Sequence, residues 1–172
     1  MKYAEIYHEY ESCLSQKNAF LAELSGLKEG CVSVKNISGK QYSYLQKKKN
    51  GKVCSEYIRK DDLEQVAAEL RKRHDLEQAI ELKNDQMDKL EAAAKLLDRK
   101  LYQALIGSRR CSLMDSLPLD IRGNTLEFGN AVAALEGIPV SKEVEENLSL
   151  WATGQYSYKD SFFQILAKYK LI

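Results

Sequence analysis

The sequence predicts an α+β protein that is mainly α-helical. Apolar residues recur at helical spacing over most of the chain, whereas one segment between positions 31 and 58 is rich in β-branched and aromatic residues. This segment contains Asn50-Gly51, the dipeptide most typical of a two-residue β-hairpin turn. We therefore expect an N-terminal helix, a three-stranded antiparallel meander, a long helix and three short C-terminal helices.

The first predicted helix covers residues 2–25. Its apolar residues follow mostly three- and four-residue steps and form one face of an amphipathic helix: Tyr3, Ile6, Tyr7, Tyr10, Leu14, Phe20, Leu21 and Leu24. Gly26 follows directly, and glycine is a common residue just beyond a helix end.

Three short strands are expected next. They lie near residues 31–34, 42–45 and 53–58, and the turn-forming sequences Ser38-Gly39-Lys40 and Asn50-Gly51 separate them. Short turns between consecutive strands predict an antiparallel meander.

Asp61 or Asp62 can cap the next helix, and this helix is expected to be long because no Gly or Pro follows until Gly107. A helix of about 45 residues would span about 65 Å. Its apolar stripe is interrupted by Arg73, Glu77 and Asn84. Since propensity alone stabilises such a helix little, we expect the N-terminal helix to cover one part of the stripe. Self-association with a second copy, or a break near Asn84, would account for the rest.

The C-terminal third is expected to be a separate small unit. Gly107 to Pro118 interrupts the helical pattern, which predicts a body at 1–107, a linker at 108–121 and a three-helix domain at 122–172. The first short helix should end before Gly137, Ser141 should cap the second, and Gly154 should close it. Ser157 should cap the third helix.

Composition excludes several classes of protein. The chain of 172 residues has a net charge of only +1, which argues against a dedicated DNA-wrapping protein. It has no apolar run long enough for a transmembrane helix, and its charged N-terminus does not fit a signal peptide. We therefore expect a cytoplasmic protein with no membrane partner.

No motif indicates catalysis or metal binding. Glycine-rich phosphate loops, HExxH and GxSxG are absent from the sequence, and His8 and His74 lie among acidic residues on predicted helices. The four cysteines show no CxxC spacing, which favours reduced thiols over a zinc site. We expect neither enzymatic activity nor a bound cofactor or metal.

Residues 130–141, NAVAALEGIPVS, resemble the inhibitory segment of the VbhA-like antitoxins, and the helices up to residue 172 resemble the rest of that small domain. The family motif has a hydroxyl residue, three variable positions, then Glu followed by Gly or Asn. Glu136 and Gly137 match it, whereas Val132 stands at the hydroxyl position.

The resemblance implies a function. Antitoxins of this family bind Fic-domain AMP-transferases, and their glutamate pairs with a toxin arginine that otherwise holds the γ-phosphate of ATP. Glu136 would have this role here, since a bidentate Arg–carboxylate pair is strong and directional. The Gly-Asn-Gly-Arg loop of Fic enzymes is absent from this sequence, so we expect a hetero-complex with a separate toxin. The expected docking residues are Leu126, Phe128, Asn130, Ala133, Leu135, Trp151 and Phe162.

Two alternatives from other classes remain open. One is a transcriptional regulator that binds DNA through the hairpin lysines Lys47, Lys48, Lys49 and Lys52. The other is a structural coiled-coil adaptor. Residues 30–66 also resemble an uncharacterised bacterial family with a small sheet and a long helix, which suggests a fold and no activity.

Overall fold

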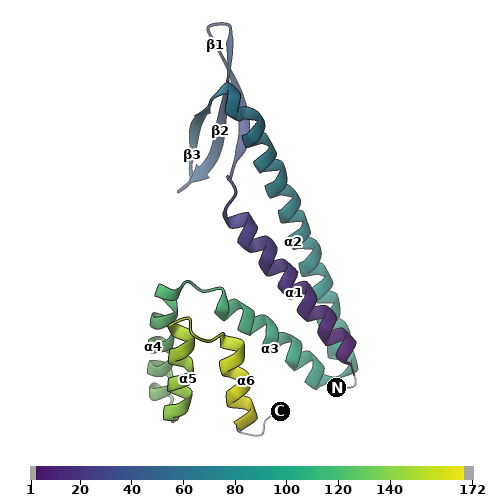
Figure 1. The fold of residues 1–172 in the computed structure, drawn as a ribbon, viewed down its shortest axis with the longest axis vertical. Helices are drawn as coiled ribbons and strands as arrows, with labels where there is room; N and C mark the ends of the chain where they lie inside the picture. The colour runs from purple at the N-terminus through teal and green to yellow at the C-terminus, as the bar shows by residue number, and fades with distance from the viewer. Residues whose placement is uncertain (1–2, 169–172) are drawn as a thin grey trace. The chain divides into compact units, whose positions relative to one another are not determined.

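The computed structural model describes residues 3–168, with side chains through Ile165. Figure 1 shows the order of the elements along the chain. They are α1 (Ala4–Ser25), β1 (Cys31–Ile37), β2 (Lys40–Lys49), β3 (Lys52–Ile58), α2 (Leu63–Leu97), α3 (Arg99–Asp115), α4 (Leu119–Leu135), α5 (Lys142–Ala152) and α6 (Tyr158–Lys168). A short 3-10 turn, Lys60–Asp62, precedes α2. The α+β, mainly helical class is confirmed, with six α-helices within residues 3–168 in place of the expected five.

The chain forms two compact units. One is His8–Leu90; the other begins at Glu91 and also includes the residues before His8. Helices α1 and α2 therefore each belong mostly to the first unit, and α3 to α6 belong to the second.

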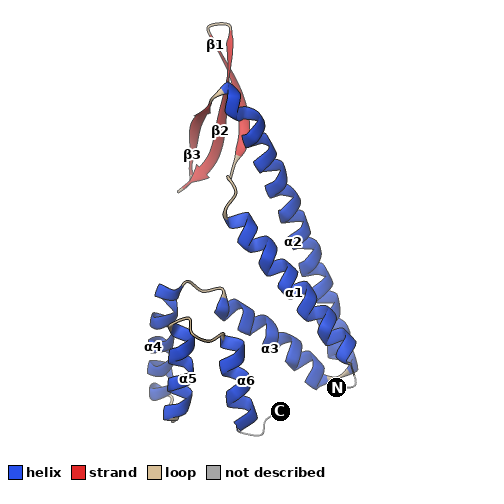
Figure 2. Cartoon of the chain, viewed as in Figure 1, coloured by secondary structure: helices blue, strands red, loops and turns tan. Residues whose placement is uncertain are grey.

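The sheet has the order β1-β2-β3 and is antiparallel throughout, as Figure 2 shows in red. Both hairpins turn through two residues with positive φ, Ser38-Gly39 and Asn50-Gly51. This is the backbone that a two-residue hairpin with the natural strand twist requires, and it confirms the predicted Asn-Gly turn. Just before β1, a Cβ atom at Gly30 would collide with the backbone carbonyl of Gln46.

One face of the sheet packs against the start of α2. Leu45 on β2, Ile58 on β3 and Val66 on α2 form the buried cluster. Three partly buried residues complete it: Val32, Leu63 and Leu70. These apolar contacts hold the helix on the sheet, since burial of apolar surface is the main stabilising term.

Helices α1 and α2 run antiparallel within the first unit. The thiol of Cys13 lies 3.6 Å from the side-chain oxygen of Gln86, and Lys72 forms an ion pair with Glu23 near the other end of α1. Burial raises the pKa of the Cys13 thiol, so this sulfur is a packing group. Thus α1 covers part of the apolar stripe of α2, as expected for the N-terminal helix.

The long helix breaks at Asp98, not near Asn84. The side chain of Asp98 accepts hydrogen bonds from the backbone N–H groups of Lys100, at 2.7 Å, and Leu101, at 3.1 Å. The backbone of Asp98 is extended, with φ −159° and ψ 122°. Asp98 is therefore a helix N-cap that ends α2 and starts α3.

The helix end predicted at Gly107 is wrong. α3 continues through Gly107 to Asp115, so most of the predicted linker 108–121 is helical, and only residues 116–118 separate α3 from α4. Buried residues on both sides of the glycine, Leu105 and Ser108, explain the continuity, because tertiary packing offsets the low helix propensity of glycine.

None of the helices within residues 3–168 has the length and apolar character needed to cross a lipid bilayer.

Replacing Asp98 by Ala should lower the free energy of unfolding by about 1 kcal/mol, because two backbone N–H groups lose their acceptor. Asp98→Asn, which keeps a capping oxygen, should stay close to the parent. Asp75→Ala, an exposed acid within α2, is the matched control. Urea unfolding followed by circular dichroism measures the difference, and equal losses for Asp98→Ala and Asp75→Ala would contradict the assignment of the cap.

Candidate functional site

Helix α4 ends at Glu136 in a complete Schellman motif. Glu136 is the C-cap, Gly137 follows with φ +68°, and the N–H of Ile138 donates to the carbonyl of Ala133 at 2.8 Å. The N–H of Gly137 donates to the carbonyl of Ala134 at 3.2 Å. The positive φ favours glycine strongly, so the helix end predicted here is confirmed and the Glu136 backbone is held in a defined geometry.

The Glu136 side chain is exposed, and no ion pair among the side chains described, up to Ile165, includes it. Val132 lies one turn earlier on the same helix and is half-buried. The carboxylate therefore stands on an ordered helix end with its acceptor oxygens available to a donor from another molecule.

Exposed apolar residues line one side of α4. Ile121, Phe128 and Leu135 recur every seven residues, and their exposed fractions rise from 44% to 72% and 88% towards Glu136. Ile138 adds a side chain that is 54% exposed just after the helix. We name these four residues the α4 stripe. Several large apolar side chains exposed on one side of a helix favour an interaction surface.

The other predicted docking residues of α4 lie away from the stripe. Leu126, Asn130 and Ala133 are half-buried and follow Arg122 at steps of four, four and three residues, so they share its side of the helix. Arg122 contacts Trp151 of α5, which places this side against the neighbouring helix. Of the seven predicted docking residues, Phe128 and Leu135 are therefore the two most open to a partner.

Trp151 is a core residue. Only 1% of its surface is exposed, so its prediction as a direct docking residue is wrong. The guanidinium carbon of Arg122 lies 5.5 Å from the indole centroid, and its Nη1 donates to the Trp151 carbonyl at 3.3 Å. This cation–π and hydrogen-bond pair joins α4 to the end of α5.

The same guanidinium also binds the end of α3. Arg122 donates from Nη2 to the carbonyl of Asp115 at 2.6 Å and from Nε to the carbonyl of Leu117 at 2.9 Å. The last carbonyls of a helix lack intrahelical donors and carry partial negative charge. One arginine thus satisfies carbonyl groups at the ends of two helices.

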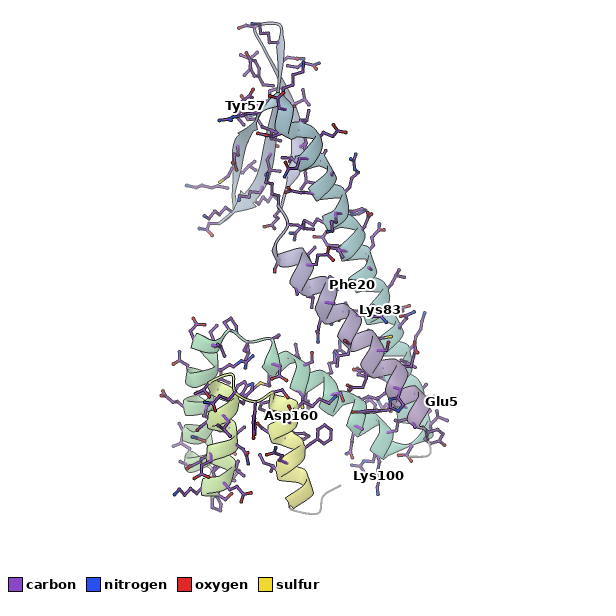
Figure 3. The ribbon with its side chains drawn as sticks, viewed as in Figure 1. Glu5, Phe20, Tyr57, Lys83, Lys100 and Asp160 are labelled. Atoms are coloured by element: carbon purple, nitrogen blue, oxygen red, sulfur yellow. The ribbon has the colours of Figure 1, made fainter. Side chains whose placement is uncertain are left out.

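Helix α6 begins at a double cap. The Asp115 carboxylate accepts from the backbone N–H of Tyr158 at 2.6 Å, and the Ser157 hydroxyl accepts from the N–H of Asp160 at 3.0 Å while donating to its carboxylate. Asp160 is labelled on α6 in Figure 3. The prediction that Ser157 caps this helix is confirmed, and Asp115 is a capping residue that sequence reasoning missed, because it lies 43 residues away from Tyr158.

Phe162 lies on a different surface from the α4 stripe. It is half-buried, its ring is 6.5 Å from that of Tyr158, and both line a hollow of about 510 Å³ between α3 and α6. The Tyr158 ring also contacts Trp151 edge-to-face, at 5.1 Å between centroids. Burial raises the pKa of the Tyr158 phenol, and Cys111 and Asp115 act in the same direction.

The predicted nucleic-acid lysines are exposed but do not share one face. In the register of the sheet, Lys47 and Lys49 point to the side of the buried Leu45, and Lys52, paired with Lys49, lies on that side too. Lys48 points to the opposite side, because successive strand residues alternate.

The described residues contain no group of three or more His, Cys, Asp or Glu side chains arranged to hold a metal ion.

A family model described as a domain of unknown function, DUF6788, matches residues 4–68. The match covers α1, the sheet and the start of α2, and it stops before the segment that contains Glu136. No curated protein and no solved structure matches the chain. The comparisons therefore assign no activity, and a functional proposal depends on the residues themselves.

Replacing Arg122 by Ala should destabilise the C-terminal unit by about 2 kcal/mol, because partly buried carbonyls lose a charged donor. Trp151 is the only tryptophan of the chain, so its fluorescence during urea unfolding reports this unit directly. Arg122→Lys keeps the charge but not the fork of donors, and should recover less than half of the loss.

Arg110→Ala, an exposed arginine on α3, is the control and should change stability by less than about 0.5 kcal/mol. A loss for Arg122→Ala no larger than that of this control would contradict the central position of Arg122.

The raised pKa of Tyr158 predicts a loss of stability at high pH. An unfolded tyrosine ionises near pH 10, whereas the folded phenol keeps its proton at higher pH. The folded state then binds a proton that the unfolded state has lost, so stability falls as pH rises above about 10. Tyr158→Phe should show a smaller decline between about pH 9 and 11 than the parent.

Tyr156→Phe, which removes a phenol that is 43% exposed, is the matched control and should follow the parent. Parallel pH curves for the parent and Tyr158→Phe would disprove this assignment.

Proposed function

We propose that this protein is an antitoxin that binds a separate Fic-domain AMP-transferase and blocks productive ATP binding through Glu136. The observation that carries the proposal is the placement of Glu136: an exposed carboxylate at an ordered helix end, beside an exposed apolar stripe. The resemblance of residues 130–141 to the VbhA-like antitoxins supplies the target class.

The chemistry of inhibition follows from the pairing of a carboxylate with an arginine. An arginine that holds the γ-phosphate presents a planar fork of N–H donors, and a carboxylate matches that fork in two parallel hydrogen bonds. Glu136 in this position would occupy the donors that ATP needs. A displacement of a reacting group by about 1 Å can lower a rate about 100-fold. Glu136 would therefore inhibit the enzyme even if ATP still bound, provided that the triphosphate were held out of its reactive position.

The α4 stripe would provide the docking contacts. Phe128 and Leu135 are the most exposed of its residues, at 72% and 88%, and their burial on a partner surface would favour binding. Gly137 lets the chain turn away directly after Glu136, which leaves the carboxylate at the edge of the docking surface. Val132, where the family has a hydroxyl residue, would replace a polar contact by an apolar one.

The test uses a Fic-domain AMP-transferase from the same genome, one encoded beside the gene for this chain where the genome carries one, copurified with the chain and assayed for auto-AMPylation with labelled ATP. The parent chain should form a complex and suppress the modification. Glu136→Gln preserves the shape and removes the charge, so auto-AMPylation should rise about 10- to 100-fold while the complex remains intact, because a charged hydrogen bond is worth about 1.5–3 kcal/mol.

Glu127→Gln, another exposed acid on α4, should inhibit like the parent. Phe128→Asp combined with Leu135→Asp should abolish the complex itself. Inhibition by Glu136→Gln as strong as by the parent would show that the glutamate mechanism is wrong, and a parent chain that does not bind the Fic protein would overturn the proposal as a whole.

A further inference from the structure

Positive charge is concentrated in the sheet and the two residues that follow it. Residues 31–60 contain seven lysines and one arginine against one glutamate, a net charge of +7, whereas the whole chain carries +1. A segment of this charge attracts polyanions.

The two faces of the sheet differ in composition. One face packs on α2 through Leu45 and Ile58. The strand pairing places a second set of residues on the opposite side, which we name the outer face: Lys35, Lys40, Tyr42, Tyr44, Lys48 and Tyr57, with uncharged residues between them. No strand residue of the outer face is acidic, and every one is exposed or half-buried.

The three tyrosines form one cluster across two strands. The Tyr57 ring lies 5.8 Å from that of Tyr44 and 6.2 Å from that of Tyr42, measured between centroids, and Tyr57 is 53% exposed. Figure 3 labels Tyr57 on the sheet. The Lys35 ammonium lies over the Tyr44 ring, 4.9 Å from its centroid. Cations and the aromatic cluster therefore share this face, with Lys35 against Tyr44 and with Lys40 and Lys48 on either side of the two β2 tyrosines.

A hollow of about 420 Å³ adjoins the cluster. Tyr42 and Tyr57 line it together with Lys40 and Lys60, and none of its lining residues is acidic. A flat, uncharged ring with an attached anion fits such a hollow, because the tyrosines offer stacking surface and the lysines offer donors.

We propose that the outer face binds single-stranded nucleic acid, with phosphates on the lysines and bases stacked on the tyrosines. Platforms of this kind combine basic side chains with exposed aromatic rings and tolerate many sequences. The Tyr57 ring is tilted by 67° to the Tyr44 ring and by 57° to the Tyr42 ring, so the cluster presents ring faces in different directions and suits separate, unstacked bases better than the parallel stack of a duplex. An acidic peptide would use the lysines alone and leave the tyrosine cluster without a role.

This site is built from residues of the first compact unit, and Glu136 belongs to the second. The inference therefore goes beyond the proposed inhibition of a Fic enzyme, and either one can fail without the other.

The test measures binding of the full chain to fluorescein-labelled oligo-dT and oligo-rU of about a dozen nucleotides by anisotropy, over a series of salt concentrations. If each of the three lysines of the outer face contacts one phosphate, and each contact contributes about −0.7 to the slope, log affinity should fall against log salt with a slope of about −2. Tyr57→Ala should weaken binding at least about tenfold, and Tyr57→Phe, which keeps the ring, should not.

Lys35→Ala should reduce the salt slope by about 0.7, whereas Lys95→Ala, an exposed lysine on α2, should leave it unchanged. Tyr42→Ala serves as a second stacking variant, and circular dichroism checks that each variant is folded. The proposal is overturned by a parent that does not bind, by equal affinity for duplex DNA, by wild-type binding of the folded alanine variants, or by full competition from poly-glutamate.

Discussion

The C-terminal unit depends on the guanidinium group of Arg122. It donates to the backbone carbonyls of Asp115, Leu117 and Trp151, and it covers the Trp151 ring. Because a guanidinium is planar, permanently charged and rich in donors, it can satisfy several unpaired carbonyls that no single neutral side chain could satisfy together. The Asp115 carboxylate then caps α6, so the ends of four helices meet within a few residues of this group.

This arrangement determines which side of α4 is free. With Arg122 directed towards the ends of α3 and α5, the residues that follow it at helical spacing face inward, and Phe128 and Leu135 face outward. The Glu136 carboxylate follows at the helix end, where the Schellman motif of Gly137 limits its backbone freedom. A carboxylate on a fixed backbone loses less entropy when it meets an arginine than one on a mobile loop would lose.

Features set by local chemistry could be predicted from the sequence. Asn50 and Gly51 tolerate positive φ, Ser141 offers an oxygen to the N–H of Val144, and Gly137 ends α4. The break at Asp98 was missed because it lies among strong helix formers with no glycine or proline, although aspartate is itself a strong N-cap residue.

Features that depend on distant residues were not predictable. From the sequence alone, a large apolar residue such as Trp151 fits a docking surface as well as a core. Its burial depends on the contact with Arg122, which lies 29 residues earlier in the chain. The helix across Gly107 likewise depends on the burial of Leu105 and Ser108. The tyrosine cluster required the strand register, because Tyr57 meets Tyr44 only through the pairing of β2 with β3.

The uneven charge of the chain has a consequence for its behaviour in solution. With +7 in residues 31–60 and +1 overall, the remaining residues carry −6, so a near-neutral protein consists of two oppositely charged parts. At low ionic strength the basic segment of one copy attracts the acidic residues of another, and little net repulsion opposes this attraction near the isoelectric point of about 7.6. Added salt weakens this attraction, because at 0.1 M charges more than about 10 Å apart are largely screened from each other. We therefore expect the protein to salt in, so that its solubility near neutral pH rises with moderate salt, as for a zwitterion.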